Sequence, residues 1–153
     1  MLFAREGATV VGTDINMDAM EETAKLLRET GAEHHLTRCD VTDSASIESL
    51  VENALSRYGR IDVLVNNLGG SAKGGPVEMT EELWLKQINY NLTSVFLMCK
   101  HVLPIMKAQN GGSIVNTAST SGIRWTGAAL AAAVMGFPLL VRAIRLSIEA
   151  VDR

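Results

Sequence analysis

The sequence has little cysteine and no excess of positive charge. Its two cysteines, Cys39 and Cys99, stand far apart and form no CxxC pair. That usage is typical of a reducing compartment and not of a disulfide or zinc framework. We therefore expect a cytoplasmic protein without a metal site. The net charge of −3 also argues against partners such as nucleic acid or an anionic membrane surface.

Long hydrophobic runs are also absent. The first residues, MLFAREG, are charged from Arg5 onward and lack the apolar centre of a signal peptide. The longest uncharged stretch, residues 125–141, contains two glycines and Pro138 and is short for a helix that spans a bilayer. We expect no membrane segment and interpret this stretch as a buried helix.

The chain does contain enough apolar sequence for one folded domain. Hydrophobic residues make up 47% of its 153 residues. This share excludes a disordered chain, and the length suits one hydrophobic core and not two. We therefore treat residues 1–153 as a single domain.

Strand-like and helical segments alternate through the first part of the chain. Apolar runs predict strands at 8–14, 34–40, 61–65 and 111–119. Between the first three strands, apolar residues at helical spacing, each series followed by a glycine, predict helices at 17–30 and 43–58. This alternation is typical of an α/β fold with a parallel sheet covered by helices on both faces.

Further helices are predicted between the third strand and the end of the chain. Thr80 suits the cap of a short helix at 81–88, and a longer helix at 91–107 contains Pro104, which favours a kink. A last helix is expected at 127–150. The helix at 91–107 is apolar nearly all round, which indicates burial, in part in a subunit interface.

Polar side chains follow the predicted strands, where ligands bind in parallel α/β sheets. Asp14 ends the first strand and either accepts the hydroxyls of an adenosine ribose or caps a turn with Asn16. Asp40 ends the second strand and either accepts the adenine amino group or forms a turn. Ser119 ends the fourth strand, where a hydroxyl is able to orient a carbonyl group.

The segment 66–76 has the composition of a loop. It begins with two asparagines, Asn66 and Asn67, and two glycines follow shortly after. Two amides supply hydrogen-bond donors and acceptors, and glycines let the backbone approach a ligand, so we favour a ligand-facing loop over a plain turn. Asn91 opens a predicted helix and is also a candidate for its N-cap.

The three histidines show no metal-ligand spacing. We interpret His34 and His35 as strand residues that point to alternate faces, and His101 as a residue on a helix surface.

Six stretches in order resemble the short-chain dehydrogenase/reductase (SDR) family: FAREGATVVGTDIN, CDVTD, IDVLVNNLGG, INYNLTSVF, HVLPIM and GGSIVNTASTSG. They cover about residues 2–122, and Leu68 stands where the family usually has alanine. The resemblance implies a doubly wound, Rossmann-like parallel sheet. It also implies an NAD-dependent oxidoreductase that moves hydride between a nicotinamide cofactor and a small alcohol or carbonyl substrate.

The resemblance also assigns roles to individual positions. The carboxylate of Asp14 would bind the adenosine ribose, which implies NAD and not NADP. Asn91 would hold a proton-relay water, and Ser119 would orient the substrate. The positions that would contact the cofactor are Asp14, Ile15, Asp40, Val41, Asn67, Leu68 and Gly69.

The family's opening strand and its TGxxxGxG turn, which cradles the pyrophosphate, have no match in this sequence. In the family this strand is the centre of the sheet, with the first two strands of this chain on one side and the next two on the other. The family's C-terminal strands have no match either. We therefore expect an incomplete dinucleotide-binding domain with two unpaired interior strand edges. Either these edges pair directly, or the fold is unstable or is completed by another chain.

The family's catalytic YxxxK pair is also missing. Leu130 and Val134 stand at those positions in the best local alignment. The only tyrosines are Tyr58 and Tyr90, and the last lysine is Lys107, so the remainder of the chain contains no such pair. Losing a positioned general acid lowers a rate by about 10²–10⁴.

These observations leave three functional hypotheses open. The chain is an NAD-dependent oxidoreductase with part of its site and weak or no turnover, a non-catalytic Rossmann-type module that forms a homo-oligomer, or a gene fragment that does not fold stably. The apolar helices at 91–107 and 127–150 motivate the second hypothesis. Tyr90 is expected to face away from Asn91 on the helix, and so is not assigned as a substitute acid.

Overall fold

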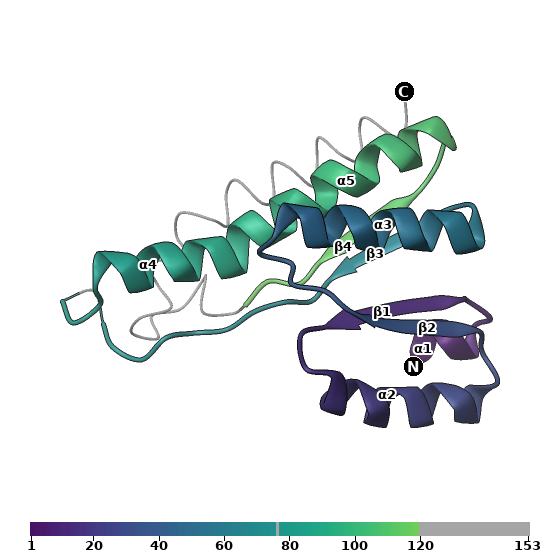
Figure 1. Ribbon diagram of the computed structural model, residues 1–153, viewed down its shortest axis with the longest axis horizontal. Helices are drawn as coiled ribbons and strands as arrows, with labels where there is room; N and C mark the ends of the chain where they lie inside the picture. Colours follow the sequence, from purple (N-terminus) through teal and green to yellow (C-terminus); the bar gives the residue numbers. More distant parts are fainter. Residues whose placement is uncertain (76, 120–153) are drawn as a thin grey trace.

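The first two strands form a parallel pair at the N-terminal end of the molecule. The computed structural model describes residues 1–75 and 77–119. Strand β1 (Val10–Asp14) lies beside β2 (His34–Arg38), with Asp14 opposite Arg38 at the end of the register. Helix α1 (Leu2–Arg5) precedes this pair, and α2 (Met17–Thr30) connects its strands and packs against them (Figure 1).

Helix α2 begins and ends where its sequence predicts. The side chain of Asn16 accepts a hydrogen bond from the Ala19 backbone N–H at 3.1 Å, which satisfies one of the donors left open at a helix start. At the other end Gly31 takes the left-handed conformation with φ of 71°. The buried face consists of Met20, Ala24 and Leu27.

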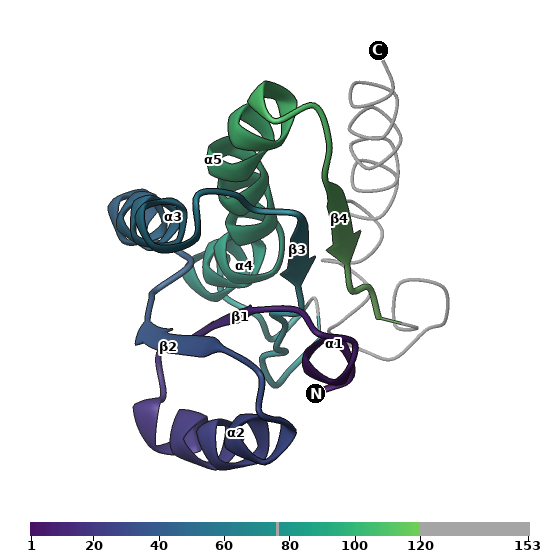
Figure 2. The ribbon, with the colours of Figure 1, turned by 90° about the vertical axis from the view of Figure 1, so that its right-hand side faces the viewer.

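The second parallel pair joins β3 (Val63–Asn66) and β4 (Ser113–Asn116). Helix α3 (Ser44–Tyr58) precedes β3, and the Asp43 carboxylate caps it by accepting hydrogen bonds from two backbone N–H groups. In Figure 2 the described helices α3 and α5 lie on one side of this pair.

A nearly continuous helical rod connects β3 to β4. It consists of α4 (Glu81–Ile88), a π-helical segment (Asn89–Thr93) and α5 (Ser94–Ala108). The sequence pattern predicts that the second helix starts at position 91, as a separate element. The structure corrects that boundary, because the π-helical turn carries the chain from α4 into α5 without a break. Pro104 lies inside α5, as expected.

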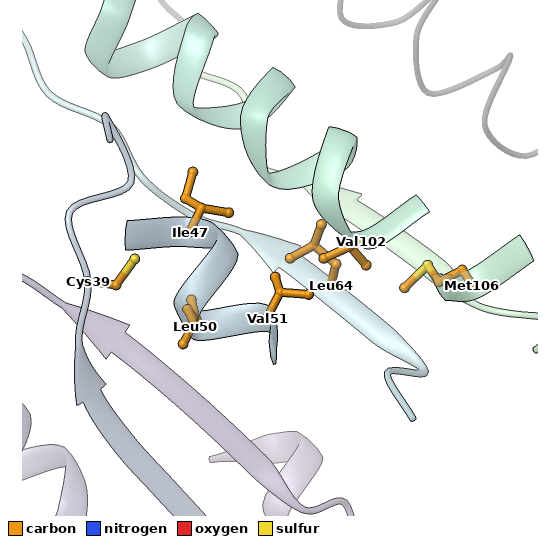
Figure 3. Packing of buried hydrophobic residues seen from close by; sticks show 7 residues of the cluster. All are labelled: Cys39, Ile47, Leu50, Val51, Leu64, Val102 and Met106. Carbon is orange, nitrogen blue, oxygen red and sulfur yellow. The ribbon is translucent and has the colours of Figure 1, made fainter. Parts of the chain in front are cut away.

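The principal core lies between α3, α5 and β3. Ile47 and Met106 are completely buried, and Val102 is 1% exposed. Figure 3 shows how these side chains meet between the two helices and the strand. The full cluster of buried residues is Cys39, Ile47, Leu50, Val51, Leu64, Val102 and Met106.

The two strand pairs remain separate sheets. Within the described residues β1 pairs with β2 and β3 pairs with β4, and neither pair bonds to the other. The expected grouping of the strands is therefore confirmed, and the alternative in which the interior edges pair directly is wrong. For the interior edges to pair directly, the two sheets would have to approach each other. Each sheet is held in its place by the helices that pack against it.

One face of the second sheet has partly exposed side chains. Val63, Val65 and Val115 are 43%, 44% and 47% exposed. The described helices α3 and α5 cover the opposite face, which carries Leu64. The predicted helix at 127–150 lies outside the described residues. Within the described part of the chain, no helix combines the length and the apolarity that crossing a bilayer requires.

The core makes a direct prediction. Val102→Ala removes two methyl groups from a site that is 1% exposed and is expected to lower the free energy of unfolding by about 2 kcal/mol. Val77→Ala is the matched control, because Val77 is 92% exposed. Urea titration followed by circular dichroism measures both. Equal losses in the two variants, or no cooperative transition in the parent chain, would contradict this core.

Candidate functional site

Four strands end at the same edge of the molecule, and their polar residues form the candidate site. Because both pairs are parallel, the carboxyl ends of β1 and β2 lie together, as do those of β3 and β4. Asp14 is the last residue of β1, Asp40 follows β2, and Asn67 follows β3. Ser119 follows β4 after a short extension and is exposed. The strand predicted over 111–119 thus ends earlier, at Asn116.

Asp14 uses one carboxylate oxygen for local structure. Its Oδ1 accepts a hydrogen bond from the Asn16 backbone N–H at 2.9 Å, so the predicted turn is confirmed. Oδ2 makes no hydrogen bond with the rest of the described chain. The neighbouring Ile15 is 57% exposed and places an apolar surface beside this carboxylate. The geometry keeps one anionic oxygen available at the end of β1.

Asp40 is held more firmly. Its Oδ1 accepts hydrogen bonds from the Thr42 backbone N–H at 2.9 Å and from the Thr42 hydroxyl at 2.7 Å. These two bonds, and more weakly the positive charge of Arg38, hold the pKa of the Asp40 carboxyl below its ordinary value against the opposing effect of burial. The predicted turn is confirmed here also. Val41 packs against the core cluster and not into an open surface.

An asparagine pair ties the ends of β3 and β4 together. The buried Asn66 donates a hydrogen bond from Nδ2 to Oδ1 of Asn116 at 2.7 Å, and the same nitrogen lies 3.8 Å from the Cys99 sulfur. Burial raises the pKa of the Cys99 thiol, which keeps it protonated. Sequence reasoning missed Asn116. The signal was its position, because a polar residue in an apolar strand opposite another asparagine predicts a pair.

The loop after β3 is fastened to the helical rod. Oδ1 of Asn91 accepts a hydrogen bond from the Gly70 backbone N–H at 3.0 Å, and Nδ2 donates to the Gln87 carbonyl at 2.9 Å. Asn91 is therefore not the N-cap of a helix, because it lies inside the π-helical segment and caps no helix start. Its amide binds the loop instead.

Tyr90 does not face away from this loop. A Cβ atom at Gly70 would lie 3.0 Å from Cε1 of Tyr90, so the phenol ring sits directly against that glycine. Tyr90 and Asn91 thus contact the same residue. The expectation assumed regular α-helical geometry, in which consecutive side chains diverge. The loop runs across the π-helical turn and meets both.

The remaining predicted positions are distributed as follows. Asn67 and Gly69 are exposed and Leu68 is half-buried. Leu130 and Val134, which stand where the resemblance expects tyrosine and lysine, lie outside the described residues. The described ranges 1–75 and 77–119 contain no group of three or more His, Cys, Asp or Glu residues that could hold a metal ion.

His101 is not a simple surface residue. Its Nε2 lies 3.0 Å from the Ser44 hydroxyl, and this contact joins α5 to the start of α3. The residue is half-buried between these two helices. The contact is structural, and it lies on the helices that build the core.

The assembled edge offers complementary chemistry. Two carboxylates at the β1–β2 ends accept hydrogen bonds, and the glycine-containing loop after β3 allows a close approach. A hydroxyl follows β4. Carboxylates that accept hydrogen bonds suit the hydroxyls of a sugar or an exocyclic amine, and they oppose a phosphate at the same place.

Comparison with known proteins gives consistent results. A family model described as Enoyl-(Acyl carrier protein) reductase matches residues 1–143. The 3-oxoacyl-(acyl-carrier-protein) reductase FabG of Thermotoga maritima is 42% identical over 123 residues, which are 80% of this chain and 50% of that protein. Across FabG and three further curated relatives, the chain spans between 39% and 50% of the relative's own length.

Solved structures resemble the chain closely. A Burkholderia xenovorans protein assigned to the short-chain dehydrogenase/reductases shares 48% sequence identity with a TM-score of 0.90, over 98% of this chain and 58% of that one. A variant of actinorhodin polyketide ketoreductase, solved with NADPH, shares 34% identity with a TM-score of 0.82, over 96% of this chain and 58% of that one.

The hydrogen bonds from Thr42 to Asp40 predict a measurable change in the pKa of Asp40 when Thr42 is replaced. Thr42→Val removes the hydroxyl donor and is expected to raise the pKa of Asp40 toward that of an ordinary aspartic acid, whereas Thr42→Ser keeps the donor and leaves it unchanged. Because the folded pKa is lowered, the stability from this contact is present at neutral pH and is lost as the pH falls through the folded pKa. NMR titration of the carboxyl carbon measures the effect. An identical Asp40 pKa in the parent and both variants would contradict it.

Proposed function

The chain belongs to the short-chain dehydrogenase/reductase family of Rossmann-fold oxidoreductases, and from this premise we propose that it binds the adenosine side of a nicotinamide cofactor at the carboxyl ends of its strands. The single observation that carries the proposal is the arrangement of two acceptor carboxylates, Asp14 and Asp40, with the glycine loop at one edge. Relatives of this chain include a ketoreductase solved with NADPH, which supports the cofactor class.

The donor set fits an adenosine group. Oδ2 of Asp14 is placed to accept a ribose hydroxyl, with the exposed Ile15 beside it. Asp40 stays ionised at neutral pH, so its outer oxygen is placed to accept the adenine amino group, with Val41 lying next to it. Asn67, Leu68 and Gly69 line the same edge beyond β3.

Asp14 selects NAD over NADP in this proposal. A carboxylate that accepts the ribose hydroxyls would lie against the 2′-phosphate of NADP, and two negative charges at that distance repel each other. The Asn16 bond fixes the orientation of the carboxylate and leaves its other oxygen directed outward.

The substrate class follows from the family: a small molecule that carries an alcohol or carbonyl group. When bound, the cofactor supplies hydride chemistry to such a group. In this proposal the hydroxyl of Ser119, which follows β4, orients the substrate oxygen, and Asn91 holds a proton-relay water while its amide fixes the loop after β3. With Leu130 and Val134 at the positions of the family's acid and its lysine, we propose that proton transfer has no positioned group and that turnover is weak or absent.

The second candidate function is a self-associating module without catalysis. Phe96 on α5 is 61% exposed and Leu85 on α4 is 64% exposed, so the helical rod carries large apolar groups on its surface. Sedimentation at micromolar concentration distinguishes the two candidates, because a chain that sediments as a monomer would exclude the self-associating module.

Cofactor preference is the first test. The parent chain is expected to bind NAD at least about tenfold more tightly than NADP, equivalent to about 1.4 kcal/mol. Asp14→Ala is expected to reduce this ratio toward one by removing the repulsion. Asp18→Ala, an equal change in charge on the neighbouring helix, is the control and keeps the ratio. Isothermal titration calorimetry measures all three proteins. A parent chain that binds both cofactors equally would overturn the role of Asp14.

Turnover is the second test. Hydride transfer from NADH to a panel of ketones and β-keto thioesters is expected to lie about 10²–10⁴ below that of a relative with the complete acid pair. Any residual rate is expected to be lower in Ser119→Ala than in the parent, because the Ser119 hydroxyl orients the substrate oxygen in this proposal. Absorbance of NADH follows the reaction. A robust parent rate that Ser119→Ala abolishes would show that the chain is a competent enzyme.

A further inference from the structure

The loop that follows β3 is held by more than one side chain of the helical rod. Besides the Asn91 contact, the Ala72 backbone N–H donates a hydrogen bond to Oε1 of Gln87 at 3.2 Å. The Tyr90 ring lies against Gly70, as the 3.0 Å approach to a hypothetical Cβ shows. Figure 1 shows the loop running back alongside α4 before it enters that helix.

The π-helical turn brings these groups to one place. Gln87 lies in the last turn of α4, and Tyr90 lies inside the π-helical segment. The widened turn is itself stabilised, because the buried Ser94 donates a hydrogen bond from its hydroxyl to the Tyr90 carbonyl at 2.7 Å. π-Helical turns of this kind are frequent at functional sites.

We propose that Gln87 and Tyr90 are positioning residues that hold residues 70–72 in the shape in which this loop lines the cofactor. Gln87 fixes the backbone at Ala72 by a hydrogen bond, and Tyr90 covers Gly70 by ring packing. Both residues act through the loop in this proposal. The role of the loop in cofactor binding rests on the proposed function, whereas its attachment to the helical rod does not.

The ring and not the hydroxyl of Tyr90 carries this role. The contact to Gly70 is made by ring carbons Cε1 and Cδ1, and no hydrogen bond of the Tyr90 hydroxyl occurs within the described residues. Tyr90→Phe should therefore preserve the loop, and Tyr90→Ala should release it. If the phenol instead acted through its hydroxyl as a proton donor, Tyr90→Phe would lose the function as Tyr90→Ala does.

Cleavage by trypsin after the exposed Lys73 measures the opening of the loop without any cofactor. Lys73 lies directly after the fastened segment, so tryptic cleavage at this site reports how often the loop opens. Tyr90→Ala and Gln87→Met, which removes the acceptor at similar volume, are each expected to speed this cleavage about tenfold. Tyr90→Phe and the control Tyr58→Ala are expected to cleave at the parent rate. Mass spectrometry of the fragment that ends at Lys73 identifies the site.

Affinity for NAD gives the second readout. Tyr90→Ala and Gln87→Met are expected to weaken binding about tenfold while Tyr90→Phe binds as the parent does. If the parent binds no nucleotide but the cleavage rates still follow this order, the proposed function fails and the attachment of the loop stands. Unchanged cleavage in both Tyr90→Ala and Gln87→Met would overturn the positioning role, and Gln87→Met keeps it testable should the alanine variant fail to fold.

Discussion

The packing of α3 and α5 against β3 is the interaction on which the rest of the structure depends. Ile47, Val102 and Met106 exclude water almost completely where these elements meet. This contact fixes the direction of the helical rod, and with it the π-helical turn that meets the loop after β3. The β1–β2 pair has α2 as its own cover and contributes the two carboxylates at the opposite end of the site. A candidate site thus exists because two separately packed layers present their strand ends at one edge.

In the candidate site the same side chains shape the local backbone and offer hydrogen-bond acceptors to a ligand. Asp14 and Asp40 each use one oxygen to shape the turn after a strand. The functional and the structural interpretations of these residues are therefore compatible, since a carboxylate has a second oxygen. Asn91 differs, because both ends of its amide are bonded to protein backbone. These two bonds shape the loop after β3.

Much of the local structure could be predicted, because it depends on neighbouring residues. The Thr80 cap and the glycine stops depend on a few neighbouring residues, so their sequence signals mark helix boundaries correctly. The π-helical turn could not be predicted, because periodicity assumes a constant number of residues per turn. The pair Asn66–Asn116 was missed for a different reason: its partners are distant in sequence and meet only through the register of β3 and β4.

The family, the order of strands and helices, and the polar residues that end each strand could all be identified from the amino-acid order, because short motifs and local periodicity encode them. Two further features emerged only from the folded chain: Tyr90 turns toward the loop, and His101 joins two helices. Each of these outcomes depends on which surfaces meet in space. Packing sets that relation through the whole chain, and no single segment encodes it.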